Sequence, residues 1–228
     1  MNESERIEKI MEQVNRKLSE GREFRMTQKI EAREADDGKM FVRGYATTFD
    51  EEYLLYDFGD YRVFESVDKN AFEGCDMSDV IMQYDHAGRV YARNRNKTLE
   101  LGTDDHGLAI EAELSGTDLG RQVYQEISGG YTDRMSMCFR VGKDERTVEE
   151  DHDTGRITVH RKITKISKLY DVSAVSYPAN PATEISARNF CEGVIEEIKQ
   201  ERLRAQEEAR ARKALALRIK IDTMIGKE

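Results

Sequence analysis

Apolar and polar residues alternate along much of the chain between residues 22 and 188, and a period of two predicts β-strands. The alternation is clear over residues 24–32. The turn-forming residues 36–39, Asp-Asp-Gly-Lys, follow, and residues 40–49 alternate again. The pattern therefore predicts a hairpin at the start of this region.

The same reasoning predicts the remaining elements of residues 22–188. Residues 98–114 form a second hairpin around the turn Asp104-Asp105-His106-Gly107, and residues 117–128 have helical spacing that ends at Gly129-Gly130. Further strands are expected over residues 133–141, 157–167 and 169–177, with a charged excursion over residues 142–155.

The two ends of the chain differ from this middle region. Residues 1–21 predict a short amphipathic helix. Residues 189–228 are rich in Ala, Glu, Arg and Lys and predict a long charged helix. Its apolar positions do not form a regular heptad, so we expect weak packing rather than a stable coiled coil. Three segments result: residues 1–21, 22–188 and 189–228.

Composition narrows the class of protein. The 228 residues are 38% apolar and 36% charged, which suits one domain with a core and solvated segments. A net charge of -9 argues against nucleic acid as a partner, and no apolar run is long enough to cross a membrane. The three cysteines lack CxxC spacing and are expected to be reduced thiols of a cytoplasmic protein. No HExxH or comparable spacing indicates a metal, and no cofactor is expected.

Ser136 is a candidate nucleophile because of its place in a strand. Met135, Met137 and Phe139 share one face of that strand, so Ser136 and Cys138 lie on the other. If the apolar face packs inward, the hydroxyl is presented on the side away from the core. An ordinary polar strand residue would show the same pattern.

His86 and Asp171 are the candidates for a base and its partner. His86 follows an apolar strand, residues 80–84, and precedes Gly88, which places the imidazole at a strand end. A surface or capping histidine is the plain alternative. Asp171 lies in an apolar strand, where a carboxylate needs a partner such as a histidine N–H, or a cation such as Lys168.

Taken in order, several segments resemble the tailed-phage prohead serine proteases. They are Gly44-Tyr45-Ala46, Asn70-Ala71-Phe72, the segment around His86, the hairpin containing Thr98-Leu99 and Gly107-Leu108, Met135 to Phe139, and Leu169 to Ala179. The resemblance covers residues 24–188 and extends in fold to the herpesvirus assembly proteases. It implies a mainly β, α+β fold: a small closed antiparallel β-barrel with flanking helices, a short N-terminal helix and a long C-terminal helix.

The resemblance also implies roles. Ser136 matches the family nucleophile, His86 its base and Asp171 its acidic residue, and the reaction would be acyl transfer through an acyl-enzyme. For the oxyanion, backbone N–H groups near Asn180 or at Gly129-Gly130 are candidates.

The implied substrates are the scaffolding segment of the capsid protein or a separate scaffold, and the chain itself. The implied partners are the major capsid protein and scaffold segments inside the prohead, in the host cytoplasm. Self-association into a homo-oligomer is compatible with this role. The C-terminal helix would direct the enzyme into the prohead.

Two other functions remain open at this point. The chain could be a non-catalytic structural barrel of the same lineage, such as a tube or scaffold protein. It could also be a cysteine protease that uses Cys138, which shares a strand face with Ser136.

Overall fold

The computed structural model describes residues 20–175 and 181–225. The chain divides into two compact units, residues 1–188 and residues 189–228. The helix predicted for residues 1–21 lies almost wholly outside the described residues.

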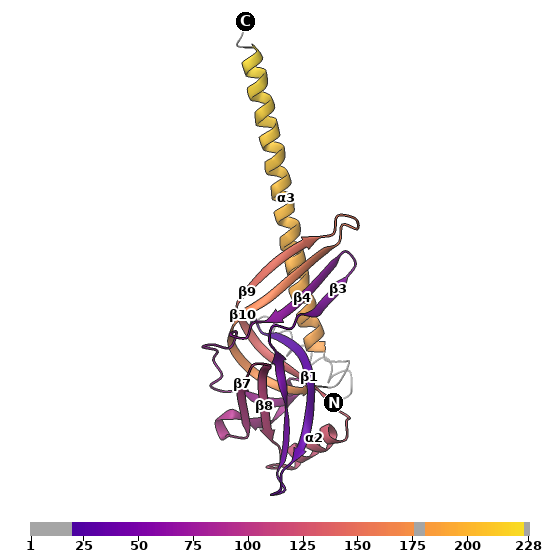
Figure 1. The fold of residues 1–228 in the computed structure, drawn as a ribbon, viewed down its shortest axis with the longest axis vertical. Helices are drawn as coiled ribbons and strands as arrows, with labels where there is room; N and C mark the ends of the chain where they lie inside the picture. Colours follow the sequence, from indigo (N-terminus) through magenta and orange to yellow (C-terminus); the bar gives the residue numbers. More distant parts are fainter. Residues whose placement is uncertain (1–19, 176–180, 226–228) are drawn as a thin grey trace. The chain divides into compact units, whose positions relative to one another are not determined.

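Strands dominate the first unit, as Figure 1 shows. The elements of the described residues, over both units, follow in sequence order. They are β1 (Glu23–Glu34), β2 (Met40–Thr48), β3 (Tyr53–Phe58), β4 (Tyr61–Val67), β5 (Ile81–Tyr84), β6 (Ala87–Arg93), a 3-10 turn (Asn94–Asn96), β7 (Leu99–Thr103), β8 (Gly107–Glu113), α2 (Asp118–Ser128), β9 (Arg134–Glu150), β10 (Ile157–Val175) and α3 (Pro181–Ile225).

The strands form one sheet in the order β3-β4-β10-β9-β1-β2-β8-β7, with β5 joined to β10 and β6 joined to β5. The predicted mainly β, α+β class is confirmed, but the predicted closed antiparallel barrel is wrong. The described sheet is open and ends at β3 and β7, and β10 pairs in parallel with both β4 and β5.

Among the described strands, β3 pairs with β4 alone and β7 with β8 alone, so the two ends of the sheet do not meet. The pairing of β1 with β9 stops at Glu23 and Phe139, so the outer half of β9 is paired with β10 alone. On its other edge, β10 pairs with β4 over Ile157–Ile163 and with β5 over Asp171–Ala174. β10 therefore carries two branches of the sheet on this edge, one through β4 and one through β5.

The charged residues 142–155 also differ from the expectation. Most of them belong to β9, which stays paired with β10 as far as Glu150. The turn comes at residues 151–156, where Asp151 Oδ1 accepts the N–H groups of Asp153 and Thr154 and Gly155 has a φ of +69°. The two strands expected after the excursion are a single strand, β10.

The paired outer halves of β9 and β10 are called the ribbon below. A buried ionic cluster, which we call the clamp, stabilises the ribbon and consists of Glu23, Arg25, Glu65, Asp144 and Arg161. Arg25 Nε lies 2.5 Å from Glu65 Oε1, and Arg161 Nη1 lies 2.7 Å from Glu65 Oε2. Arg161 Nε also contacts Asp144 at 2.6 Å, and both arginines contact Glu23. The clamp joins β1, β4, β9 and β10 through side chains that the sequence pattern does not connect.

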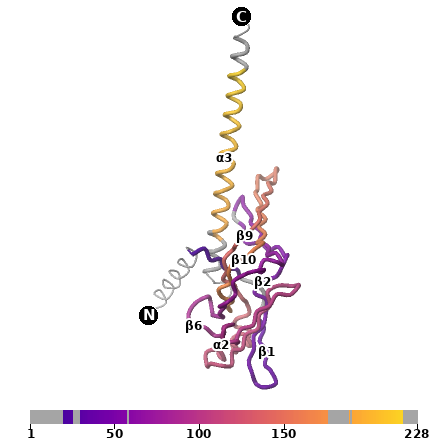
Figure 2. The backbone as a smooth tube through the Cα atoms, turned by 90° about the vertical axis from the view of Figure 1, so that its left-hand side faces the viewer, coloured from indigo at the N-terminus to yellow at the C-terminus, as the bar shows by residue number. Residues whose placement is uncertain are grey.

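Both predicted helices of the described part are present. The N-terminus of α2 is capped by Thr117, whose hydroxyl accepts the N–H of Gly120 at 3.0 Å, and its apolar face enters the core through Val123 and Ile127. The second view of the backbone, Figure 2, shows α3 as one uninterrupted helix. No helix within the described residues is long and apolar enough to cross a membrane.

Candidate active site

Ser136 lies in the middle of the sheet. It occupies β9, with Met26 of β1 as its neighbour on one side and Ser173 of β10 on the other. Met135, Met137 and Phe139 belong to the hydrophobic core, as their shared face predicts. The hydroxyl therefore lies on the opposite face, where it is also fully buried.

His86 lies in a two-residue turn that joins β5 to β6. Tyr84 and Ala87 are paired across this turn, and Asp85 and His86 have φ values of 49° and 56°. Two positive φ angles are typical of the type I′ turn, which usually contains Asn or Gly because other residues are strained there. The turn is fixed to the sheet because the N–H of Asp85 donates to the carbonyl of Ala174 at 2.9 Å.

Asp171 comes from β10, directly across from Cys138 of β9. Its neighbour Lys168, the alternative partner considered from the sequence, pairs instead with Asp76 at 2.6 Å. The Asp171 carboxylate contacts the imidazole of His86.

The structure brings the three predicted residues together in one hydrogen-bonded line. His86 Nε2 lies 2.7 Å from Ser136 Oγ, and His86 Nδ1 contacts Asp171 Oδ1 on the other side of the ring. A carboxylate can only accept, so Nδ1 carries the proton and Nε2 has a lone pair that faces the hydroxyl. A base placed beside a hydroxyl in this tautomer can remove its proton.

Water is excluded from this line. The exposed fractions are 0% for Ser136, 3% for His86 and 2% for Asp171. The ring of Phe24 packs edge-on against the imidazole, with 4.8 Å between ring centroids. A hydrogen bond in such a dry environment is stronger than one in water, and a buried carboxylate without donors would be costly.

Cys138 is a less favourable nucleophile than Ser136 in this arrangement. It lies on the same face of β9, as the sequence pattern predicts, and it is fully buried there. However, both ring nitrogens of His86 are occupied, one by Ser136 and the other by Asp171. The base is thus directed at the hydroxyl.

The other histidines lie elsewhere. His106 packs against the ring of Tyr45, His152 lies in the turn between β9 and β10, and His160 contacts Glu52 Oε1 at 2.7 Å. Among the described residues, no group of three His, Cys, Asp or Glu side chains could hold a metal.

Of the two candidates for an oxyanion site, the structure does not support Gly129-Gly130, and the other stays a prediction. The N–H groups of Gly129 and Gly130 donate to the helix carbonyls of Gln125 and Ile127 at 2.8 and 3.0 Å, so they are already used. Asn180 lies outside the described residues.

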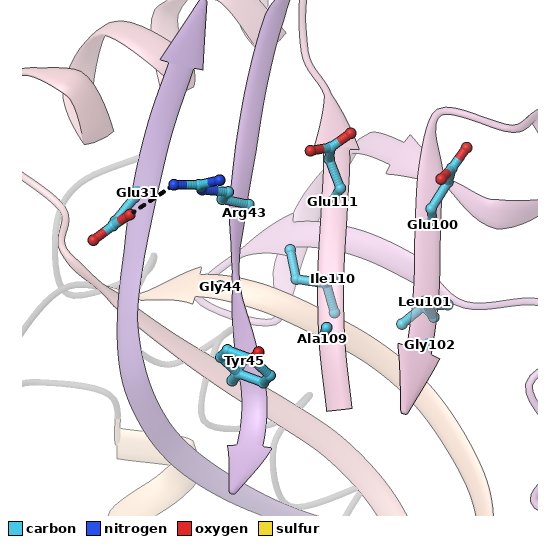
Figure 3. Close-up of a pocket in the computed structure, with 10 residues that line it drawn as sticks. All are labelled: Glu31, Arg43, Gly44, Tyr45, Glu100, Leu101, Gly102, Ala109, Ile110 and Glu111. Carbon is cyan, nitrogen blue, oxygen red and sulfur yellow. Dashed lines mark ion pairs between the residues drawn. The ribbon is translucent and has the colours of Figure 1, made fainter. Parts of the chain in front are cut away.

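A hollow of about 750 Å³ lies apart from the triad residues, on the face of the sheet formed by β1, β2, β7 and β8 (Figure 3). Glu100 and Glu111 are direct cross-strand neighbours there. The lining comprises Glu31, Arg43, Gly44, Tyr45, Glu100, Leu101, Gly102, Ala109, Ile110 and Glu111. Since His86, Ser136 and Asp171 are not among them, this hollow is not the candidate active site.

Comparison with known proteins identifies the family. The family model described as caudovirus prohead serine protease matches residues 27–200. The chain belongs to this family. The predicted resemblance is confirmed. As a member of this family, the chain is a capsid-maturation protease that belongs to the assembling phage capsid in the host cell.

Other comparisons add little to that assignment. The solved structure of the capsid assembly protease of bacteriophage T4 is similar to this chain. The match covers 68% of this chain and 98% of the T4 chain, with 10% identity and a TM-score of 0.33. No curated protein matches. The matched residues 27–200 include His86, Ser136 and Asp171.

Two features of the site were not anticipated from the sequence. One is the left-handed turn of His86, since Asp-His is not a usual type I′ sequence. The other is Ser173, whose hydroxyl donates to Asp171 Oδ1 at 2.7 Å. Its position two residues after Asp171, on the same strand face, was the signal that could have found it.

Proposed function

We propose that this chain is a prohead maturation endopeptidase that uses Ser136 as nucleophile, His86 as general base and Asp171 as the residue that orients the imidazole. The observation that carries the proposal is the hydrogen-bonded line from Ser136 Oγ through the His86 ring to Asp171. Three residues distant in sequence meet there in the order that acyl transfer requires.

In the proposed mechanism, Ser136 Oγ attacks the scissile carbonyl carbon while its proton passes to His86 Nε2. The imidazolium that forms is stabilised by the Asp171 carboxylate through the Nδ1–H. It then donates the proton to the leaving amine, the C–N bond breaks and an ester to Ser136 remains. A water molecule, deprotonated by His86, attacks this ester and releases the acid, and Ser136 regains its proton.

The proposed substrates are the scaffolding segment of the capsid protein or a separate scaffold, and the chain itself. Membership of the prohead protease family supports this assignment. The partners would then be the major capsid protein and scaffold segments, and α3 would direct the enzyme into the prohead. The exposed apolar side chains of α3, among them Leu203, Leu215 and Leu217, are available for such contacts.

The test is co-expression of the chain with its cognate capsid protein, with processing followed by gel electrophoresis and mass spectrometry. We expect Ser136→Ala and His86→Ala to abolish processing and Asp171→Ala to leave a partial activity. Ser167→Ala, which changes a serine of β10 whose hydroxyl donates to the carbonyl of Arg140, is the matched control and should process normally. Normal processing by Ser136→Ala would instead favour a non-catalytic structural protein.

A further inference from the structure

Ser173 is a buried hydroxyl beside the proposed catalytic line. It lies two residues after Asp171 in β10, so both side chains share one strand face, and it pairs directly with Ser136 of β9. Its exposed fraction is 0%. A hydroxyl at such a position needs a hydrogen-bond partner.

That partner is the Asp171 carboxylate. Ser173 Oγ lies 2.7 Å from Asp171 Oδ1, and this is the same oxygen that contacts His86 Nδ1. Because an ionised carboxylate has no proton to give, Ser173 must be the donor. One oxygen of Asp171 therefore accepts from two sides.

We propose that Ser173 is a positioning residue that fixes the orientation of the Asp171 carboxylate and thereby keeps the His86 imidazole directed at Ser136. The proposal rests on the proposed function of this site. A carboxylate turns easily about its last side-chain bond, where the torsional preference is broad. The Ser173 hydroxyl selects the orientation in which Oδ1 faces the ring.

The rigidity of the backbone makes Ser173 suitable for this task. Asp171 and Ser173 belong to a strand that is paired on both edges, with β9 on one side and β5 on the other. Their separation is thus set by the sheet and not by a loop. An ionic or hydrogen-bonded partner on a regular element holds a catalytic group more precisely than one on a loop.

The first test measures the reactivity of Ser136 in the full chain with a fluorophosphonate probe between pH 5 and 9. Ser173→Ala removes the donor without adding volume, and Ser173→Thr retains a hydroxyl. We expect Ser173→Ala to lower the maximal labelling rate by about tenfold with unchanged probe affinity, and Ser173→Thr to recover most of the rate. An unchanged maximal rate in Ser173→Ala would overturn the proposal.

The second test asks whether Ser173 acts through Asp171. In an Asp171→Asn background, Ser173→Ala should have no further effect on the labelling rate, because the group that Ser173 positions is already altered. Losses that multiply in the double variant would show that Ser173 acts independently of Asp171, and they would contradict the proposal.

The third test does not depend on activity, so it separates a failure of this inference from a failure of the proposed function. The proton NMR resonance of His86 Nδ1–H, which contacts Asp171, is recorded at one pH in a Ser136→Ala background, with and without Ser173→Ala.

A carboxylate that has turned away no longer accepts the Nδ1–H of His86, so this proton resonance should move upfield in Ser173→Ala. An unchanged resonance would mean that the carboxylate keeps its orientation and that Ser173 has only a structural role. A resonance further downfield would mean that the bond to the ring becomes stronger without Ser173. Either of these results would overturn the inference.

Discussion

At the residue scale, the turn that carries His86 combines strain with precision. Asp85 and His86 both have left-handed backbone conformations, each of which costs of order 1 kcal/mol or more for residues other than glycine. The parallel pairing of β5 with β10 and the bond from Asp85 N–H to the Ala174 carbonyl hold the turn in place. The imidazole is thus placed by the backbone of the same strand that supplies Asp171.

Replacement of Cys138 is the prediction that separates a serine nucleophile from a cysteine nucleophile. We expect Cys138→Ala to retain processing of the capsid protein and labelling of Ser136, because the imidazole already contacts the hydroxyl. The lost sulfur leaves a small cavity in a fully buried site and should lower the stability by about 1–2 kcal/mol. Labelling by a fluorophosphonate and thermal unfolding measure the two effects.

The outcome of that experiment is read against Ser136→Ala. A serine enzyme loses labelling in Ser136→Ala and keeps it in Cys138→Ala. If the activity instead disappears in Cys138→Ala while the protein stays folded, and iodoacetamide blocks the native chain, the thiol is the nucleophile.

The sequence indicated which residues of the site to examine, but not all of the residues that shape it. The strand faces of Ser136 and Asp171 follow from alternation, and the structure brings both residues to His86. Ser173 and the turn at Asp85 were not anticipated. A hydrogen bond between two side chains of one strand depends on their rotamers, and a left-handed Asp-His turn contradicts local preference.

At the element scale, the clamp explains why a highly charged segment forms strands. Glu65 is fully buried between Arg25 and Arg161, which also contact Glu23 and Asp144. These partners come from β1, β4, β9 and β10, so the cluster ties the ribbon to the body of the sheet. Its net charge is negative, because three carboxylates surround two guanidinium groups.

Glu65→Gln is the variant that tests the clamp. The amide keeps the shape of the carboxylate but leaves two buried guanidinium groups without their shared charge. Loss of one partner of a buried ion pair costs about 3–5 kcal/mol. Urea unfolding followed by circular dichroism should show a loss of this size.

The matched control is Glu145→Gln, which changes an exposed glutamate of β9 that pairs with exposed Lys143. An exposed pair is worth about 0–1 kcal/mol, so this variant should be near native in stability. Equal effects of the two substitutions would show that the clamp does not stabilise the ribbon.

The clamp also shows why the elements around it were predicted poorly. Residues 142–155 read as a charged excursion because their polar side chains give no apolar face. Their strand conformation depends on pairing with β10 and on Arg161, which is distant in sequence. Hairpins with local turns, such as β7 with β8, were predicted well because turn and alternation are both local signals.

At the scale of the whole molecule, the open sheet is the main departure from expectation. Alternation of apolar and polar residues is the same in an open sheet and in a closed barrel, so the pattern cannot distinguish them. The barrel was implied by resemblance alone. What distinguishes the two is whether the end strands β3 and β7 pair with each other, and in the described sheet they do not.

For the chain as a whole, we predict that the free energy of unfolding falls in acid because Glu23 becomes protonated. Burial raises the pKa of Glu23, but Arg25 and Arg161 outweigh burial and lower the pKa from 4.5 to about 2. A carboxyl whose pKa is lowered on folding stabilises the protein above its unfolded pKa, and this stabilisation is lost as the pH falls. Glu23 should therefore contribute about 3 kcal/mol near neutral pH, lost between about pH 4.5 and 2.

Unfolding by urea at a series of pH values between 7 and 2 measures this contribution. The native chain should lose stability steeply below pH 4.5, and Glu23→Gln should start from a lower stability and lose less over the same range. Parallel curves for the two proteins would exclude Glu23 as a source of the acid sensitivity.

The complete burial of the Ser136 hydroxyl has a consequence for when such an enzyme can work. Reaction requires the attacking and attacked atoms to come within about 3–3.5 Å, and no bond of another polypeptide can approach so closely while the hydroxyl stays covered. Under the proposed function, a substrate or a labelling probe therefore reacts only when the cover over the Ser136 hydroxyl opens, and the frequency of this opening sets an upper limit on the rate of cleavage.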